Sequence, residues 1–267
     1  MEVENARVVS LAQNVPGPLA VARMRRAGAS VIKVEPLGGD PFIELSRDWY
    51  AEMHEGIEVE RLDLKSERGR ARMAALLCDA DLFVTSQRPS ALARLGVDAG
   101  SLRASCPRLR FLRIVGSVFD PERPGHDLTY QAQAGLLGDA MPRSLFADVM
   151  ASERAYTAAI ELLQQAPGSA ADVGLLESVE PLLAPIRHGL TTPDGVLGGA
   201  APRYRTYRAK VGRVAVAALE KHFEARLHEA FGLPLGADLA EPLLDRTADE
   251  WEAWAQSHDL PIVAIRN

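Results

Sequence analysis

The stretch VVSLAQNVPGPLAVARMRRAGASVIKVE, residues 8–35, decides the fold of this chain. It begins with the apolar run Val8–Leu11 and ends with the β-branched run Val31–Glu35, and each run is typical of a buried strand. Between them, residues 19–27 place apolar and basic side chains at helical spacing, and Gly28 ends that helix. A strand, a crossover helix and a second strand predict a parallel sheet.

The alternation of strands and helices continues to about residue 165. Ser66 is the expected cap of one helix, with Glu67 in its first turn. The expected strands are residues 61–64, 81–84 and 109–115, and the expected helices are 66–78, 91–95, 131–137 and 151–165. We therefore predict an α/β fold whose large domain is a Rossmann-like parallel sheet.

The composition changes at Pro167–Ala171, where Pro, Gly and Ser gather. We expect a large domain over residues 1–170, a small α+β domain over 171–250, and a helix end and strand over 251–267 that return towards the large domain. The further expected elements are a helix at 174–183, a hairpin of strands at 204–207 and 211–218, helices at 224–231 and 248–257, and a strand at 260–265.

The overall composition indicates a globular protein with small-molecule partners. Of the 267 residues, 47% are hydrophobic and 25% charged, and the net charge of −6 comes from intermixed acids and bases. No basic block suggests nucleic acid, and no apolar run reaches the roughly 18 residues of a membrane span. The first residues are too acidic for a secretory signal, so we expect a cytoplasmic location. Cys78 and Cys106 are interpreted as small buried hydrophobes, without a disulfide framework or a zinc pattern.

Two side chains with acid–base chemistry stand near the middle of the chain. His126 lies in the segment RPGHDLTYQ, residues 123–131, and Asp148 lies in FADV, residues 146–149. A histidine exchanges protons near neutral pH, and a carboxylate can do the same or attack a thioester. On its own, His126 would be an ordinary loop histidine, and Asp148 would be a helix cap. The five other histidines are expected to be solvated and show no metal spacing: His54, His188, His222, His228 and His258.

Six segments in order resemble the signatures of the family III CoA-transferases, which include the α-methylacyl-CoA racemases. They cover most of residues 8–223, and six motifs in order are far more specific than one. The matching residues are Gly17-Pro18 with Gly28–Pro36 and Gly38–Pro41; Leu62–Ser66 with Gly69-Arg70; Arg88-Pro89 with Arg94–Gly96; Arg123–Gln131; Ala147-Asp148; and Gly198–Tyr207 with Ala218–Glu220 and Phe223.

The resemblance implies that the chain binds acyl-CoA thioesters. In the transferases, the aspartate that matches Asp148 is the nucleophile. In the racemase branch, which this chain resembles more, His126 and Asp148 would lie on opposite faces of the α-carbon and exchange its proton. Arg88 and Glu220 match the charged lining of that site. Members of the family are intertwined homodimers, so a homodimer is expected.

The resemblance also implies contacts with CoA, which enters as the substrate thioester, and no metal. The residues that match CoA contacts are Pro16, Gly17, Gly38, Gly39, Lys65, Arg72 and Arg88. Residues 54–60 are acidic where the family carries a basic, phosphate-holding segment. The alternative candidates for the CoA phosphates are Arg47, Arg61, Lys65, Arg68, Arg70 and Arg72. Ser86-Gln87 replaces the family's Asn-aromatic pair, and the shortened part after Asp148 predicts a reduced small domain.

Three functions stay open at this point. The leading one is racemisation of a 2-methylacyl-CoA, in which a base removes the acidic α-proton and an acid returns one from the other face. The second is CoA transfer between carboxylic acids through a thioester of Asp148. The third is a homologue that binds a ligand without catalysis.

Overall fold

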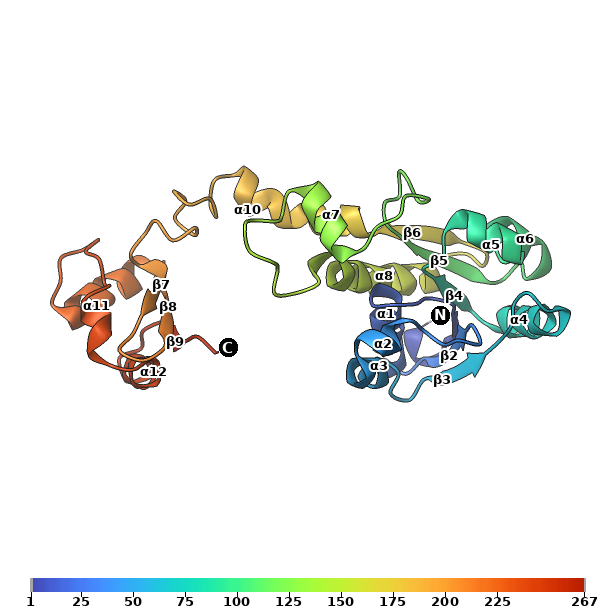
Figure 1. The fold of residues 1–267 in the computed structure, drawn as a ribbon, viewed down its shortest axis with the longest axis horizontal. Helices are drawn as coiled ribbons and strands as arrows, with labels where there is room; N and C mark the ends of the chain where they lie inside the picture. The colour runs from blue at the N-terminus through green and yellow to red at the C-terminus, as the bar shows by residue number, and fades with distance from the viewer. Residues whose placement is uncertain (1, 267) are drawn as a thin grey trace. The chain divides into compact units, whose positions relative to one another are not determined.

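Six parallel strands form the centre of the first unit, in the order β3-β2-β1-β4-β5-β6 (Figure 1). The structure is a computed structural model that describes residues 2–266, and this unit extends to Leu183. The strands are β1 (Arg7–Ser10), β2 (Ser30–Glu35), β3 (Glu58–Arg61), β4 (Leu82–Thr85), β5 (Arg110–Val115) and β6 (Ala170–Gly174). The strand order reverses between β1 and β4, which is where Rossmann-like sheets bind ligands. The predicted α/β class is confirmed.

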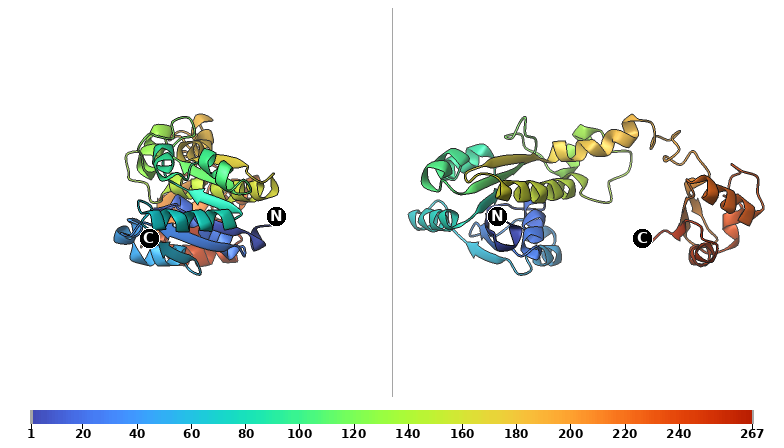
Figure 2. Two further views of the ribbon diagram at one scale, coloured as in Figure 1. Left: turned by 90° about the vertical axis from the view of Figure 1, so that its right-hand side faces the viewer. Right: turned by 180° about the vertical axis from the view of Figure 1, so that it is seen from behind.

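Two apolar cores flank this sheet, because successive strand residues point to opposite faces. On one face, α1 (Pro16–Arg26) and α8 (Phe146–Gln164) lie side by side and cover Val8 (Figures 1 and 2). Helix α8 presents alanines at a spacing of four, a stripe without bulk that lets the two helices approach closely. On the other face, α4 (Glu67–Asp79), α5 (Pro89–Leu95) and α6 (Ala99–Ser105) cover Val9.

Shorter helices complete the first unit. Helix α7 begins immediately after His126 and, with α8, brings the two sequence-predicted acid–base residues to this unit. The remaining elements are η1 (Val3–Asn5), α2 (Phe42–Leu45), α3 (Arg47–Met53), α7 (Asp127–Ala134), α9 (Leu175–Val179) and η2 (Glu180–Leu183). Within residues 2–266, no helix has the length and apolar character needed to cross a bilayer.

The second unit, from Ala184 on, is built on a small antiparallel sheet of order β7-β8-β9. Leu227, Leu243 and Trp251 are buried in its core. Its elements are α10 (Ala184–Arg187), β7 (Tyr204–Arg208), β8 (Arg213–Ala217), α11 (Lys221–Phe231), η3 (Pro242–Asp245), α12 (Ala248–Ser257) and β9 (Ile262–Ala264). The hairpin predicted within residues 204–218 is confirmed by the pairing of β7 with β8.

Several predicted boundaries are wrong. The domain boundary expected after residue 170 cuts through β6, which pairs with β5 as the edge strand of the large sheet. The segment 251–267 contains β9, which pairs with β8 in the second unit, and its expected return towards the large domain stays a prediction. The strand expected at 61–64 is β3, which ends at Arg61.

The cysteines and two histidines also differ from their predicted environments. Cys78 and Cys106 form a disulfide between α4 and the residue that follows α6, so the expected absence of a disulfide is wrong. Cys106 is buried as predicted, whereas Cys78 is exposed. His54 and His228 are buried rather than solvated. The Nε2 atom of His228 accepts a hydrogen bond from the Gly236 N–H.

Candidate functional site

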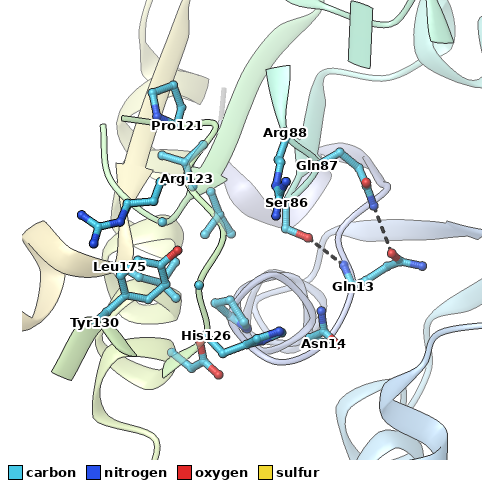
Figure 3. A pocket seen from close by; sticks show the side chains of 16 residues that line it. Gln13, Asn14, Ser86, Gln87, Arg88, Pro121, Arg123, His126, Tyr130 and Leu175 are labelled. Atoms are coloured by element: carbon cyan, nitrogen blue, oxygen red, sulfur yellow. Dashed lines mark hydrogen bonds between the residues drawn. The ribbon is translucent and has the colours of Figure 1, made fainter. Parts of the chain in front are cut away.

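A pocket lies at the carboxyl ends of β1, β4 and β5, beside the reversal of strand order, and we call it the His–Asp pocket (Figure 3). Ligands of open α/β sheets bind at this position because connecting loops part there. Every lining residue belongs to the first unit. They are Gln13, Asn14, Pro16, Ser86, Gln87, Arg88, Ile114, Val115, Gly116, Pro121, Arg123, Gly125, His126, Tyr130, Asp148 and Leu175.

His126 precedes the first residue of α7, and its backbone is fixed there. Its N–H donates to the Thr129 hydroxyl at 3.0 Å, and its carbonyl accepts from that hydroxyl at 2.7 Å. The residue is exposed, and it lines the His–Asp pocket. A fixed backbone and an exposed side chain in the pocket lining make the ring accessible to a ligand.

Asp148 is the third residue of α8 and lines the same pocket. Burial, together with the negative charge of Asp127, raises the pKa of Asp148 to about 7. A position in the first turn of a helix ordinarily favours a carboxylate. Here desolvation and like charge outweigh that effect, so the carboxyl group can carry a proton near neutral pH.

Tyr130 was missed as a site residue, although it stands on α7 only four residues after His126 and lines the same pocket. Its hydroxyl occupies space beside Gly116 and Gly125, where a Cβ atom at either glycine would collide with it. Burial raises the pKa of Tyr130, against the opposing influence of Arg88 and Arg123. The hydroxyl therefore keeps its proton and can donate a hydrogen bond to a ligand.

Arg88 and Glu220, the other residues matched to the catalytic lining, have different placements. Arg88 follows β4, precedes α5 and lines the His–Asp pocket. Arg123, which sequence reasoning did not single out, lines it too. Glu220 is exposed, immediately precedes α11 in the second unit, and is absent from the pocket lining.

A second, more apolar depression lies at the ends of β1, β2, β3 and β4, and we call it the strand-end groove. Its cavity volume is about 540 Å³, against about 130 Å³ for the His–Asp pocket. Gln13 and Gln87 line both, and the Gln87 Nε2 atom donates to the side-chain Oε1 atom of Gln13 at 3.0 Å (Figure 3). The groove residues are Leu11, Gln13, Pro36, Leu37, Leu62, Asp63, Leu64, Lys65, Gln87 and Leu95.

The residues predicted to contact CoA divide between these places. Pro16 lines the His–Asp pocket and Lys65 lines the strand-end groove, whereas Gly17 is buried where a Cβ would collide with Ala12. Gly38 and Gly39 follow the groove residue Leu37 in the loop after β2.

Some of the basic candidates for phosphate binding are engaged elsewhere. Arg72 points to the edge strand β3, where its Nη2 atom lies 2.9 Å from Glu60. Arg70 donates to the Lys65 carbonyl oxygen, and Arg61 lies 4.0 Å from Glu35. Lys65 is thus the basic candidate that the structure places directly in the groove.

A buried charged cluster lies behind the pocket wall, and we call it the Lys33 cluster: Lys33, Glu35, Asp40, Tyr50 and His54. The ammonium group of Lys33 lies 2.6 Å from Asp40, 3.0 Å from Glu35 and 2.8 Å from the His54 Nε2 atom. Asp40 also accepts from the backbone N–H of Asn14, a pocket residue with φ of 64°. The cluster therefore holds one wall of the pocket in place.

No group of three or more potential metal ligands occurs among the described residues.

A family model described as CoA-transferase family III matches residues 3–267. The chain belongs to this family. Its relatives include a "Probable fatty acyl-CoA transferase" of Mycobacterium tuberculosis, 30% identical over 146 residues, which cover 50% of this chain and 37% of that protein. An "Alpha-methylacyl-CoA racemase" of Mus musculus is 27% identical, with 87% of this chain and 65% of that protein covered.

A relative that aligns over the whole chain is the "(R)-2-hydroxy-4-methylpentanoate CoA-transferase" of Clostridioides difficile, 23% identical with 80% of its length covered. A crystal structure of a hypothetical protein from Mycobacterium tuberculosis superposes with a TM-score of 0.84 at 22% identity, covering 99% of this chain and 85% of that one. That likeness supports the fold. The chain spans 37% of the fatty acyl-CoA transferase and 65% of the racemase. The activities in these names therefore describe the relatives and not this chain.

Proposed function

We propose that this chain is an acyl-CoA enzyme that racemises a 2-methylacyl-CoA by exchanging its α-proton between His126 and Asp148. The observation that carries the proposal is that both side chains line one pocket, in which the pKa of Asp148 is raised to about 7. Near neutral pH, such a carboxyl group is present in comparable amounts as acid and as base. It can therefore both give and accept a proton in one catalytic cycle.

The proposed reaction moves one proton off and one proton onto the same carbon. One of the pair removes the α-proton, and the C–H electrons pass into the enolate of the thioester. The other then donates its proton to the α-carbon from the opposite face. The enolate oxygen needs a hydrogen-bond donor, and the Tyr130 hydroxyl is a candidate in the pocket wall.

The remainder of the CoA thioester is proposed to lie in the strand-end groove. The His–Asp pocket, at about 130 Å³, is smaller than the roughly 300–1,000 Å³ of most small-molecule sites, so it suits the acyl head alone. Because Gln13 and Gln87 line both depressions, they would meet the pantetheine arm between them. Lys65 would then contact a CoA phosphate.

Incubation of a 2-methylacyl-CoA with the enzyme in deuterated water tests this function. We expect deuterium at the α-carbon, detected by mass spectrometry, and inversion of a single enantiomer. The variants His126→Gln and Asp148→Asn should lose the exchange, whereas the matched surface variants His188→Gln and Asp139→Asn should retain it. Absence of exchange across several acyl groups would reject the proposal.

CoA transfer through Asp148 is the second candidate, and the names of several relatives favour it. The ionised carboxylate of Asp148 would attack the thioester carbon and expel the CoA thiolate, which leaves an anhydride between the acyl group and Asp148. The thiolate would then attack the Asp148 carbonyl carbon, release the first acid and form a CoA thioester of Asp148. A second carboxylate would pass through the same two steps in reverse and leave with the CoA. Acceptor-dependent CoA transfer without α-deuterium exchange would select this reaction. A mass increase on Asp148 trapped by hydroxylamine would support it further.

A homologue that binds without catalysis is the third candidate, because residues 54–60 are acidic where the family is basic. Calorimetric titration with CoA and acetyl-CoA separates it from the enzymes. Binding without exchange or transfer would leave this candidate alone, and no binding at millimolar ligand would remove both enzyme functions. A homodimer is also proposed from the family resemblance, and light scattering of the purified protein tests it.

A further inference from the structure

The side chain of Asp127 joins the two helix ends that carry His126 and Asp148. Asp127 is the first residue of α7 and only 5% exposed. Its Oδ1 atom accepts hydrogen bonds from the backbone N–H groups of Ala147 at 2.8 Å and Asp148 at 3.1 Å. Its Oδ2 atom accepts from the Gln131 side chain. One carboxylate thus bridges α7 to the first turn of α8.

Helix α8 depends on this bridge because it has no cap of its own. The first N–H groups of a helix lack partners within the helix, and a local Ser, Thr, Asp or Asn ordinarily serves them. Ser66, Asp98 and Thr247 do so for α4, α6 and α12. Residue 145, before α8, is a leucine without a capping hydrogen bond. Asp127 supplies that function from another helix.

We propose that Asp127 is a positioning residue for the His126–Asp148 pair, which holds the Asp148 end of α8 against the His126 end of α7 and places a second negative charge behind Asp148. The inference rests on the proposed function for its catalytic meaning. The bridge itself stands on the hydrogen bonds of a buried side chain.

The electrostatic surroundings support a specific role for that charge. Burial is the larger reason, and Asp127 the second, for the raised pKa of Asp148. No ion pair from Lys or Arg to either aspartate occurs within residues 2–266, and both influences on the pKa of Asp148 raise it. The other charged or titratable groups in the pocket wall are Arg88 before α5, Arg123 and His126 before α7, and Tyr130 on α7.

Asp127→Asn separates the charge from the hydrogen bonds. The asparagine oxygen can still accept from the N–H groups of Ala147 and Asp148. Its new amide group would meet the Gln131 side chain, whose Oε1 atom is buried without a partner. A flip of the Gln131 amide would turn that oxygen towards the new donor, so the variant should fold.

The test is a titration of the Asp148 carboxyl carbon by NMR, with Asp148→Asn to assign the signal. In the unaltered protein the midpoint should lie at about 7. In Asp127→Asn it should fall by about one pH unit, because only the weaker of the two causes is removed. The lower limb of the pH profile for α-deuterium exchange should move in the same direction.

Asp98→Asn is the matched control, since Asp98 also accepts two N–H groups at a helix start, in α6. It should leave the Asp148 midpoint unchanged. An unmoved midpoint in Asp127→Asn, in a variant whose circular dichroism matches the unaltered protein, would overturn the inference. Absence of exchange in the unaltered protein would instead overturn the proposed function. Because the NMR titration needs no catalysis, it tests the role of Asp127 independently of that function.

Discussion

The first unit buries ionisable groups in two neighbouring places. In one place they form ion pairs, and in the other they do not. In the Lys33 cluster, one fully buried ammonium group lies between two carboxylates, and Tyr50 donates a further hydrogen bond to Glu35 at 2.7 Å. In the His–Asp pocket, Asp148 stands beside Asp127, and neither forms an ion pair within the described residues.

This difference separates a structural use of charge from a chemical one. A buried charge that is fully paired holds elements in place, and its removal leaves its partners uncompensated. An unpaired buried carboxyl group resists ionisation, so it can carry a proton at neutral pH. The pocket wall uses both, since Asp40 of the Lys33 cluster fixes the backbone of Asn14.

The largest expected effect tests the chemical use of charge in the His–Asp pocket. Asp148→Asn removes the group that gives and accepts the proton, and we expect α-deuterium exchange to fall by about 10³-fold, the usual scale of general acid–base catalysis. Mass spectrometry of a 2-methylacyl-CoA in deuterated water measures it. Asp139→Asn, on an exposed loop, serves as the control. A variant that keeps full exchange would show that Asp148 is outside the reaction.

The substitution Lys33→Met tests the structural use of charge, because methionine has a side chain of similar length without the charge. It leaves Glu35 and Asp40 buried without their cation, so the free energy of unfolding should fall by about 4 kcal/mol. Urea unfolding followed by circular dichroism measures the loss. Lys65→Met, at an exposed lysine, should change stability by less than about 0.5 kcal/mol. Equal losses in the two variants would contradict the account of the Lys33 cluster.

A third expected effect uses the pH dependence of stability. The pKa of Asp148 is about 7 in the folded chain and near 3.9 when unfolded, so the folded state binds more protons between these values. Stability contributed by this group is therefore lost as the pH rises from about 4 to 7. Asp148→Asn removes that penalty and should be more stable than the unaltered protein at pH 8, by on the order of 2 kcal/mol after solvent screening.

At pH 4 the two proteins should differ little, because Asp148 is then mostly protonated in the fold. Thermal unfolding at both pH values, with Asp139→Asn as the reference, measures the difference. If the stability of Asp148→Asn relative to the unaltered protein were lower at pH 8 than at pH 4, the raised pKa of Asp148 would be contradicted.

The smallest expected effect concerns the affinity for CoA and two basic residues outside the Lys33 cluster and the His–Asp pocket. Lys65→Ala removes a groove cation and should weaken CoA binding about fivefold, or 1 kcal/mol. Arg72→Ala should leave the affinity within about twofold, because Arg72 is engaged by Glu60. Calorimetric titration with CoA at low salt compares them. A larger loss for Arg72→Ala would reassign the phosphate contact.

Much of the fold could be predicted because its strands are short apolar runs bounded by breakers. Val8–Leu11 and Val31–Glu35 gave β1 and β2 almost to the residue. Strand β6 was missed because Ala170–Gly174 has a single β-branched residue, Val173, and lies at an edge. Strand β3 was displaced because its acidic residues look unlike a strand, while Leu62 and Leu64 after it look apolar.

The start of α8 could not be predicted locally, since its cap stands 20 residues earlier at Asp127. The same long-range contacts account for the other misses. Lys33, within a β-branched run, gave no sign of its two carboxylate partners, and the Cys78–Cys106 disulfide has a separation of 28 residues without a motif.

The candidate site divides in the same way. His126, Asp148, Arg88 and Pro16 were singled out from family-like segments, and all four line one pocket. Tyr130 was visible in the same segment, but its role depends on Gly116, on a different element, leaving room for its hydroxyl. Glu220 stands in the second unit, and the role that the resemblance implies for it stays a prediction.

A crystal structure with a bound 2-methylacyl-CoA would test the central claim most directly. The account predicts the thioester α-carbon between the imidazole of His126 and the carboxyl group of Asp148, with the pantetheine arm passing Gln13 and Gln87 into the strand-end groove. An acyl group bound elsewhere, with the His–Asp pocket left to solvent, would contradict it.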